Sequence, residues 1–178
     1  VLTGTAGLGF DADHSILTHA GLAVVRGETG ERKAAVGDAE TIARRIVASP
    51  ASQGLSALAI VAHLLADSDD GELIRRAREL LKARGNSLLL IGAGAASLGP
   101  AWRYVAMLSD STTERRRLLE GARSRSDQAG APLWRIVSRM DLIRSGLESE
   151  FDLVQARALA EASGLQDLLA APNTSAGS

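Results

Sequence analysis

The sequence predicts an α+β protein, with a small N-terminal β-hairpin region packed on a mainly helical body. Two observations predict this division. Glycines interrupt short apolar runs throughout residues 1–37, and a helix tolerates such glycines poorly. From residue 38 to residue 171 the apolar residues instead recur at the spacing of amphipathic helices. The alternative fold is a three-layer α/β arrangement, in which residues 57–63 and 87–91 are buried parallel strands.

The hairpin is expected from two apolar runs, residues 21–26 and 32–36. Residues 27–30, which lie between them, contain two glycines, and a connection of this length and composition typically joins two antiparallel strands. Asp38 is a suitable N-cap for the first helix of the body, and Pro50 ends that helix. Residues 1–37 are therefore treated as one region and residues 38–171 as the helical body.

The next segments of the body alternate between clear and ambiguous patterns. Residues 55–66 are apolar on every side, which indicates a helix buried all round. Asp69 and Glu72 form a capping box that predicts the start of the following helix, and Gly85 predicts its end. Residues 87–91 are too few for periodicity to decide between helix and strand, and we favour a strand.

Four further helices are predicted from their first residues. A proline is well tolerated in the first turn of a helix, and a serine or aspartate followed three residues later by glutamate or glutamine is a capping pattern. The tail, residues 172–178, is predicted to be disordered. The predicted helix starts are Pro100, Ser111 with Glu114, Pro132, and Asp152 with Gln155, the last helix running through Ala170.

Composition limits the functional classes. A chain of 178 residues with 46% hydrophobic residues is globular, and a net charge of −1 excludes a polycation that coats nucleic acid. Cysteine is absent, which excludes disulfides and thiolate chemistry. No apolar stretch reaches the ~20 residues of a membrane span, and no signal-peptide pattern follows Val1, so we expect a soluble, cytoplasmic protein. Eighteen arginines and two lysines indicate the codon usage of a GC-rich bacterial genome.

The densest group of potential metal ligands is Asp11, Asp13, His14 and His19. Carboxylate and imidazole together suit zinc, manganese or iron, so a metal-dependent enzyme using these residues is one functional alternative. Their spacing matches no established ligand pattern, and aspartate next to glycine is common in turns. We therefore predict no metal and no cofactor.

Two other motifs have structural explanations. Residues 88–99 resemble the strand and glycine turn of a dinucleotide-binding site, but Ser97 replaces the third glycine and Pro100 falls where the phosphate-facing helix should run. We predict a tight turn there. The acidic residues of segment 67–72 do not have calcium-loop spacing, because the twelfth position is Arg78, and a helix cap accounts for them.

An asymmetric charge distribution is the remaining clue. Residues 101–139 contain eight arginines and four acidic residues, a charge of +4, whereas residues 140–178 contain two arginines and six acidic residues, a charge of −4. The basic segment has the groups to bind phosphates and stack a base. The simpler explanation is that its arginines pair with the acidic C-terminal helices of the same chain or of a second copy. The candidate partner-binding residues are Trp102, Tyr104, Arg115, Arg116, Arg117, Arg123 and Arg125.

The sequence thus predicts a protein-interaction or regulatory module with a charged helical face or groove for a partner protein, or for self-association. No catalytic residue is predicted, and an enzyme is the less favoured class. The alternatives are nucleic-acid binding through residues 115–125 and the metal-dependent enzyme described above.

Overall fold

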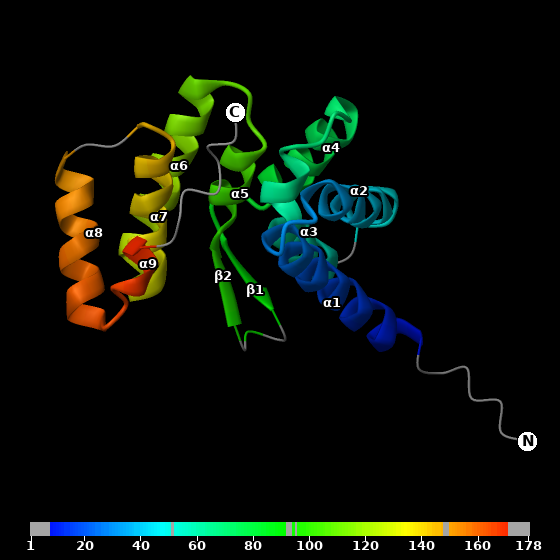
Figure 1. Ribbon diagram of the computed structural model, residues 1–178, viewed down its shortest axis with the longest axis horizontal. Coiled ribbons are helices and arrows are strands. Elements are labelled where there is room, and N and C mark those ends of the chain that lie inside the picture. Colours follow the sequence, from blue (N-terminus) through cyan, green and yellow to red (C-terminus); the bar gives the residue numbers. More distant parts are fainter. Residues whose placement is uncertain (1–7, 51, 92–93, 95, 148–149, 171–178) are drawn as a thin grey trace, which may run out of the picture. The chain divides into compact units, whose positions relative to one another are not determined.

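The computed structural model describes residues 8–50, 52–91, 94, 96–147 and 150–170 (Figure 1). For residues 8–15, 52, 53, 150–152 and 170, only the backbone is described. The chain is mainly helical with one small antiparallel sheet, which confirms the coarse α+β prediction. It divides into two compact units, the first ending at Leu108 and the second beginning at Ser109, and each is described by itself.

The first unit is built around helix α3. Leu58, Val61 and Leu65 of α3 are fully buried, because the helix packs against α1, α2, α4, α5 and both strands. This confirms that the all-apolar segment is a buried helix, and it excludes the strand alternative for residues 57–63. The elements are α1 (Leu8–Glu28), α2 (Arg32–Ala48), α3 (Ser52–Leu65), α4 (Gly71–Lys82), β1 (Leu88–Ile91), β2 (Ala96–Pro100) and α5 (Ala101–Met107).

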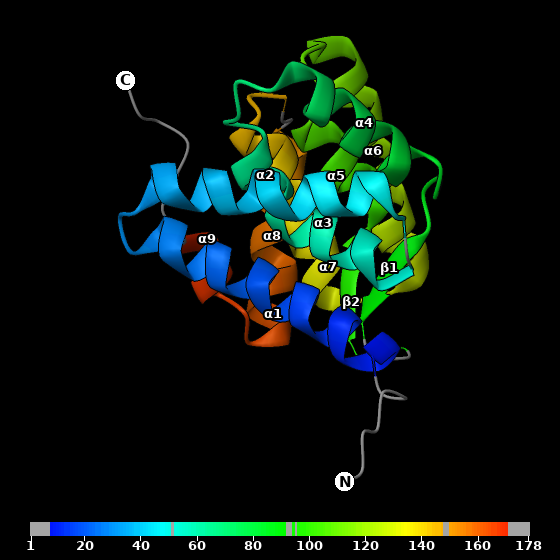
Figure 2. The ribbon, with the colours of Figure 1, turned by 90° about the vertical axis from the view of Figure 1, so that its right-hand side faces the viewer.

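The predicted N-terminal hairpin is wrong, because α1 and α2 occupy its residues. The two helices run side by side and both contact α3 (Figure 2). Asp38 is not an N-cap but lies inside α2, where its carboxylate accepts a hydrogen bond from Arg26 Nη1 of α1 at 2.7 Å. The N-cap position of α2 is held by Glu31, which makes no side-chain capping bond.

The glycines that suggested strands have other roles. Gly27 lies where α1 packs closely on the rest of the unit: a Cβ added there would stand 2.9 Å from Leu64 Cδ2 and 3.3 Å from Ala35 Cβ. Gly21 and Gly37 lie within helices, and an added Cβ would meet nothing within 4 Å. Close helix packing explains Gly27, whereas nothing in the structure requires glycine at the other two positions.

Helix α4 follows the predicted pattern with a shift of one residue at its start. Asp70, not Asp69, is the N-cap, and its carboxylate accepts a hydrogen bond from the Leu73 N–H at 3.0 Å. Leu73, Ala77 and Leu81 form the buried stripe of the helix. Beyond Lys82 the chain turns at Gly85, whose φ of +59° favours glycine.

Strands β1 and β2 form an antiparallel hairpin, with Leu88 opposite Pro100 and an irregularity after Leu89. Residues 88–91 and 96–99 are therefore two paired strands, rather than a strand and a phosphate-facing helix. Residues 88–91 form a strand, as favoured for segment 87–91, and its pairing is antiparallel. Two hydroxyls attach the hairpin to the helices: Ser56 Oγ of α3 donates to the Leu90 carbonyl at 2.8 Å, and the Tyr104 hydroxyl of α5 donates to the Leu98 carbonyl.

The second unit consists of α6 (Thr112–Ala129), α7 (Pro132–Arg144), α8 (Glu150–Ser163) and α9 (Asp167–Ala170). Helix α7 packs against α6, α8 and α9. Ser111 caps α6 by accepting a hydrogen bond from the Glu114 N–H, and Pro132 begins α7, both as predicted.

The predicted last helix from Asp152 through Ala170 is in fact two helices. Helix α8 begins at Glu150, and Gly164, with a φ of +67°, separates it from α9. The capping role of Asp152 and the predicted disordered tail lie outside the described side chains and residues. None of the described helices is long and apolar enough to cross a membrane.

Candidate functional site

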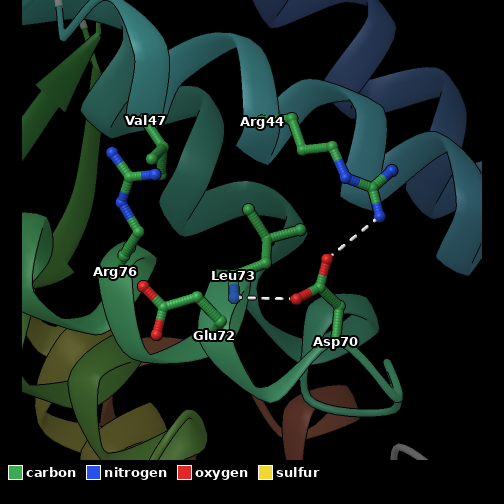
Figure 3. A pocket seen from close by; sticks show the side chains of 6 residues that line it. All are labelled: Arg44, Val47, Asp70, Glu72, Leu73 and Arg76. Atoms are coloured by element: carbon green, nitrogen blue, oxygen red, sulfur yellow. Dashed lines mark hydrogen bonds and ion pairs between the residues drawn. The ribbon is translucent and has the colours of Figure 1, made fainter.

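A groove opens between α2 and the first turns of α4 in the first unit (Figure 3). We call it the α2–α4 groove. Its volume is about 240 Å³. Its lining residues are Arg44 and Val47 of α2, and Asp70, Glu72, Leu73 and Arg76 at the start of α4.

The buried faces of α2 and α4 and the cap of α4 determine where these side chains lie. Ile42 and Ile46 face the core of the unit, so Arg44 and Val47 emerge on the flank of α2. In α4 the buried Leu73 points toward α2 and forms the apolar base of the groove (Figure 3). Asp70 is fixed beside it, because an N-cap residue must keep its carboxylate on the backbone N–H groups of the first turn.

Asp70 links the two helices. In addition to the capping bond, Asp70 Oδ2 accepts a hydrogen bond from Arg44 Nη2 at 3.2 Å. The Leu73 N–H lowers the pKa of the Asp70 carboxyl, and Arg44 lowers it further. The carboxylate is therefore ionised at neutral pH.

A second set of hydrogen bonds supports this link. Arg44 Nη2 also donates to Glu40 Oε2 at 3.0 Å, and Ser68 Oγ donates to Glu40 Oε1 at 2.6 Å. The Asp70 N–H donates back to Ser68 Oγ at 3.0 Å. The hydrogen bonds to Asp70 and Glu40 raise the pKa of Arg44. The rim of the groove is thus held in one geometry by several bonds.

The other rim is formed by α4 alone. The Glu72 carboxylate accepts two hydrogen bonds from Arg75, at 2.8 Å from Nε and 2.7 Å from Nη2, and this pairing lowers the pKa of Glu72. Arg76 is exposed, and its charge also contributes to the low pKa of Glu72. Within the described part of the chain Arg76 makes no hydrogen bond or salt bridge, and its guanidinium lies beside Val47 (Figure 3).

The arginines that the sequence singled out lie on α6, in the second unit, and have different environments. Arg115 donates to the Ser109 carbonyl, and its Nε is buried without a partner among the described residues. Arg117 and Arg123 each have an interaction partner. Arg116 and Arg125 make no hydrogen bond or salt bridge with another described residue.

These arginines do not share one face of α6. A helix turns by roughly 100° per residue, so positions 116, 117 and 125 point roughly 100°, 200° and 280° away from position 115. Positions 116 and 123 lie within about 20° of each other. The cluster in the sequence is therefore distributed around the helix.

The two aromatic candidates belong to α5 of the first unit. Tyr104 is 6% exposed, its hydroxyl is bound to the Leu98 carbonyl, and the Arg103 guanidinium lies 5.2 Å from its ring centroid. A ring with so little exposure has little surface for stacking a base. Trp102 is half-buried. The two rings belong to the first unit, and the arginines of α6 belong to the second.

Asp127 of α6 engages two arginines of α7. It accepts hydrogen bonds from Arg139 Nη1 at 2.9 Å and from Arg135 Nε at 3.1 Å. Burial raises the pKa of Asp127, but the hydrogen bonds from Arg139 and Arg135 outweigh burial and lower it. These arginines are thus paired within the basic segment itself, rather than with acidic residues after position 139.

The potential metal ligands Asp11, Asp13 and His14 lie in α1 rather than in a turn, and their side chains are outside the described part of the chain. His19 is exposed on α1 and has an interaction partner. Among the described residues, no three histidine, aspartate or glutamate side chains are close enough to hold a metal ion. The metal-dependent enzyme therefore stays an alternative hypothesis.

His63 is half-buried in α3. Burial lowers its pKa, and the charge of Arg32 lowers it further. The Arg32 guanidinium donates to the His63 carbonyl at 3.3 Å and pairs with Asp67 at 2.6 Å. The imidazole is therefore neutral at pH 7.

No protein-family model, curated protein or solved structure matches this chain. The case for a site consequently depends on its geometry alone. Sequence reasoning missed the α2–α4 groove, although it did single out the acidic segment before α4. That segment was correctly assigned to helix capping, but the residue that faces it across the groove, Arg44, precedes Asp70 by 26 positions.

Proposed function

We propose that this protein is a protein-interaction module that binds a partner polypeptide in the α2–α4 groove. The observation that carries the proposal is the combination, in one open groove, of an apolar base and a charged rim. Val47 and Leu73 supply the base, and Arg44 and Asp70 supply one side of the rim. Protein interfaces concentrate their binding energy where an apolar anchor enters a pocket that polar groups surround.

The size of the groove supports a side chain of a partner as the guest. Sites that enclose drug-sized ligands usually measure roughly 300 to 1,000 Å³. The α2–α4 groove measures about 240 Å³, so it suits one anchoring side chain together with a contact along its rim.

The rigidity of the rim also favours binding. Association costs roughly 0.5–1.5 kcal/mol for each flexible side chain that it immobilises. Arg44 already donates hydrogen bonds to two carboxylates. The Glu72 carboxylate accepts hydrogen bonds from both Nε and Nη2 of Arg75. Little ordering of Arg44, Asp70 and Glu72 is therefore needed when a partner binds.

Nucleic-acid binding is less well supported. A phosphate-binding surface needs several cations on one side of an element. The five arginines of α6 point around the whole helix, and Arg115 is engaged with the Ser109 carbonyl. The protein-interaction proposal requires no such common face.

The test is co-purification of a partner from the cells that express the protein, with wild-type protein and two variants as bait. Val47→Asp places a charge in the groove, whereas Ala34→Asp places the same charge on an exposed position near the start of α2. The proposal predicts a partner that Val47→Asp loses and Ala34→Asp retains, with both variants folded by circular dichroism. A partner that both variants retain equally would show that the groove is not the binding site.

A further inference from the structure

We infer that the α2–α4 groove recognises an acidic segment, in which an aspartate or glutamate of the partner binds Arg76 while a neighbouring apolar side chain contacts Val47 and Leu73. This inference rests on the proposed function and specifies the chemistry of its partner. It follows from an inventory of the hydrogen-bonding groups that the groove leaves unused.

The carboxylates of the groove are already occupied. Asp70 uses Oδ1 for the Leu73 N–H and Oδ2 for Arg44. Glu72 uses both of its oxygens for Arg75. A cationic guest would have to share these oxygens with the N–H groups that already bind them, and it would lie beside Arg44 and Arg75, whose like charge disfavours it.

The two arginines that line the groove differ in how far their N–H donors are already bonded. Arg44 is committed to Glu40 and Asp70. Arg76 carries five N–H donors, and none is bonded to a described residue. The group that complements the groove is therefore an acceptor, and a carboxylate matches the planar fork of a guanidinium by accepting two parallel hydrogen bonds.

The position of Arg76 also determines which residue must lie next to the carboxylate in the partner segment. Its guanidinium lies beside Val47 and above the first turns of α4, and Leu73 lies between the two walls of the groove (Figure 3). A carboxylate at Arg76 thus brings the adjoining residue of the same segment over the apolar base. An acidic residue next to a leucine, isoleucine or phenylalanine satisfies both contacts.

The experiment is an NMR titration of the full chain with three capped peptides, acetyl-Ala-Leu-Glu-Ala-amide and its glutamine and lysine counterparts. The signals to follow are the Arg76 Nε–Hε and the Val47 methyl groups. The glutamate peptide should shift both and bind about tenfold more tightly than the glutamine peptide, because a charge-assisted pair replaces a neutral hydrogen bond. The lysine peptide should bind no better than the glutamine peptide.

Two variants provide the matched comparison. Arg76→Gln removes the cation of the groove that has no carboxylate partner among the described residues, whereas Arg45→Gln removes an exposed arginine of α2 that does not line it. The preference for glutamate should disappear in Arg76→Gln and remain in Arg45→Gln. Equal binding of the three peptides, an unchanged preference in Arg76→Gln, or no shift of the groove signals would overturn the inference.

The inference and the proposed function fail in different ways. If Val47→Asp abolishes capture of the partner but Arg76→Gln does not, the groove binds a partner and the acidic specificity is wrong. If neither variant affects capture, the groove itself is the wrong site.

Discussion

Replacing the glycines of α1 and α2 tests whether the N-terminal region is helical, where the sequence pattern suggested strands. Glycine inside a helix costs roughly 0.5–1 kcal/mol relative to alanine. Gly21 of α1 and Gly37 of α2 have open space around the position of an added Cβ. Gly21→Ala and Gly37→Ala should therefore each stabilise the first unit by about 0.5–1 kcal/mol, and together by about 1–2 kcal/mol if they act independently.

Gly27→Ala is the matched control, because it adds the same methyl group to the same kind of backbone. Its Cβ would stand 2.9 Å from Leu64 Cδ2 and 3.3 Å from Ala35 Cβ, and Leu64 is fully buried. Overpacking a core typically costs about 1–3 kcal/mol, which exceeds the gain in helix propensity. We expect a net destabilisation of about 1 kcal/mol.

The assay is urea unfolding followed by circular dichroism, with the unfolding of the two units fitted separately. In a unit of about 100 residues, 1 kcal/mol corresponds to a shift of roughly 4–8 °C in Tm, so thermal unfolding provides a second measurement. Destabilisation by Gly21→Ala and Gly37→Ala, or a stabilising Gly27→Ala, would refute the packing described for α1 and α2.

Three further substitutions have defined outcomes in the same unfolding assay. Asp127→Ala removes the carboxylate that pairs with the buried guanidinium of Arg139. The substitution should destabilise the second unit by about 2 kcal/mol at pH 7. This loss is smaller than that expected for a fully buried ion pair, because the Asp127 side chain is 35% exposed. Since the pKa of Asp127 is lowered in the folded state, this difference should persist above about pH 4 and vanish as the pH falls through the lowered pKa. Tyr104→Phe removes the bond to the β2 carbonyl and should destabilise the first unit by about 1 kcal/mol. Asp70→Ala should lower the unfolding midpoint clearly more than Asp69→Ala, because only Asp70 caps α4.

Each of these expectations has a result that contradicts it. Gln128→Ala, at the exposed neighbouring position of α6, should leave stability nearly unchanged, and an equal loss in both variants would mean that the ion pair contributes nothing. A neutral Tyr104→Phe would show that the hydroxyl does not anchor the hairpin. Equal losses of stability from Asp69→Ala and Asp70→Ala would contradict the assignment of Asp70 as the N-cap of α4.

Local signals were reliable where a few neighbouring residues decide the structure. Ser111 with Glu114 marked the start of α6, and the uniformly apolar segment 55–66 marked the buried helix α3. The cap of α4 was misplaced by one residue, because Asp69 and Asp70 are chemically equivalent and only the backbone geometry selects between them.

Predictions failed where distant packing overrides a local preference. Gly27 suggested a turn, but it is needed for the approach of α1 to Leu64, which is 37 positions further along the chain. The arginines of segment 115–125 suggested one basic face, but the helix distributes them around its axis. The α2–α4 groove was not predictable, because Arg44 and Asp70 meet only once α2 and α4 have packed together.

Site-specific photo-crosslinking tests most directly whether a partner polypeptide occupies the α2–α4 groove. A benzophenone side chain replaces Val47 in one sample and the exposed Ala34 in another, and cells that express the protein naturally are irradiated. The account predicts one polypeptide adduct from position 47 that is absent from position 34, with the attachment site in an acidic segment of the partner. Adducts of equal yield from both positions, or an adduct from position 34 alone, would contradict it.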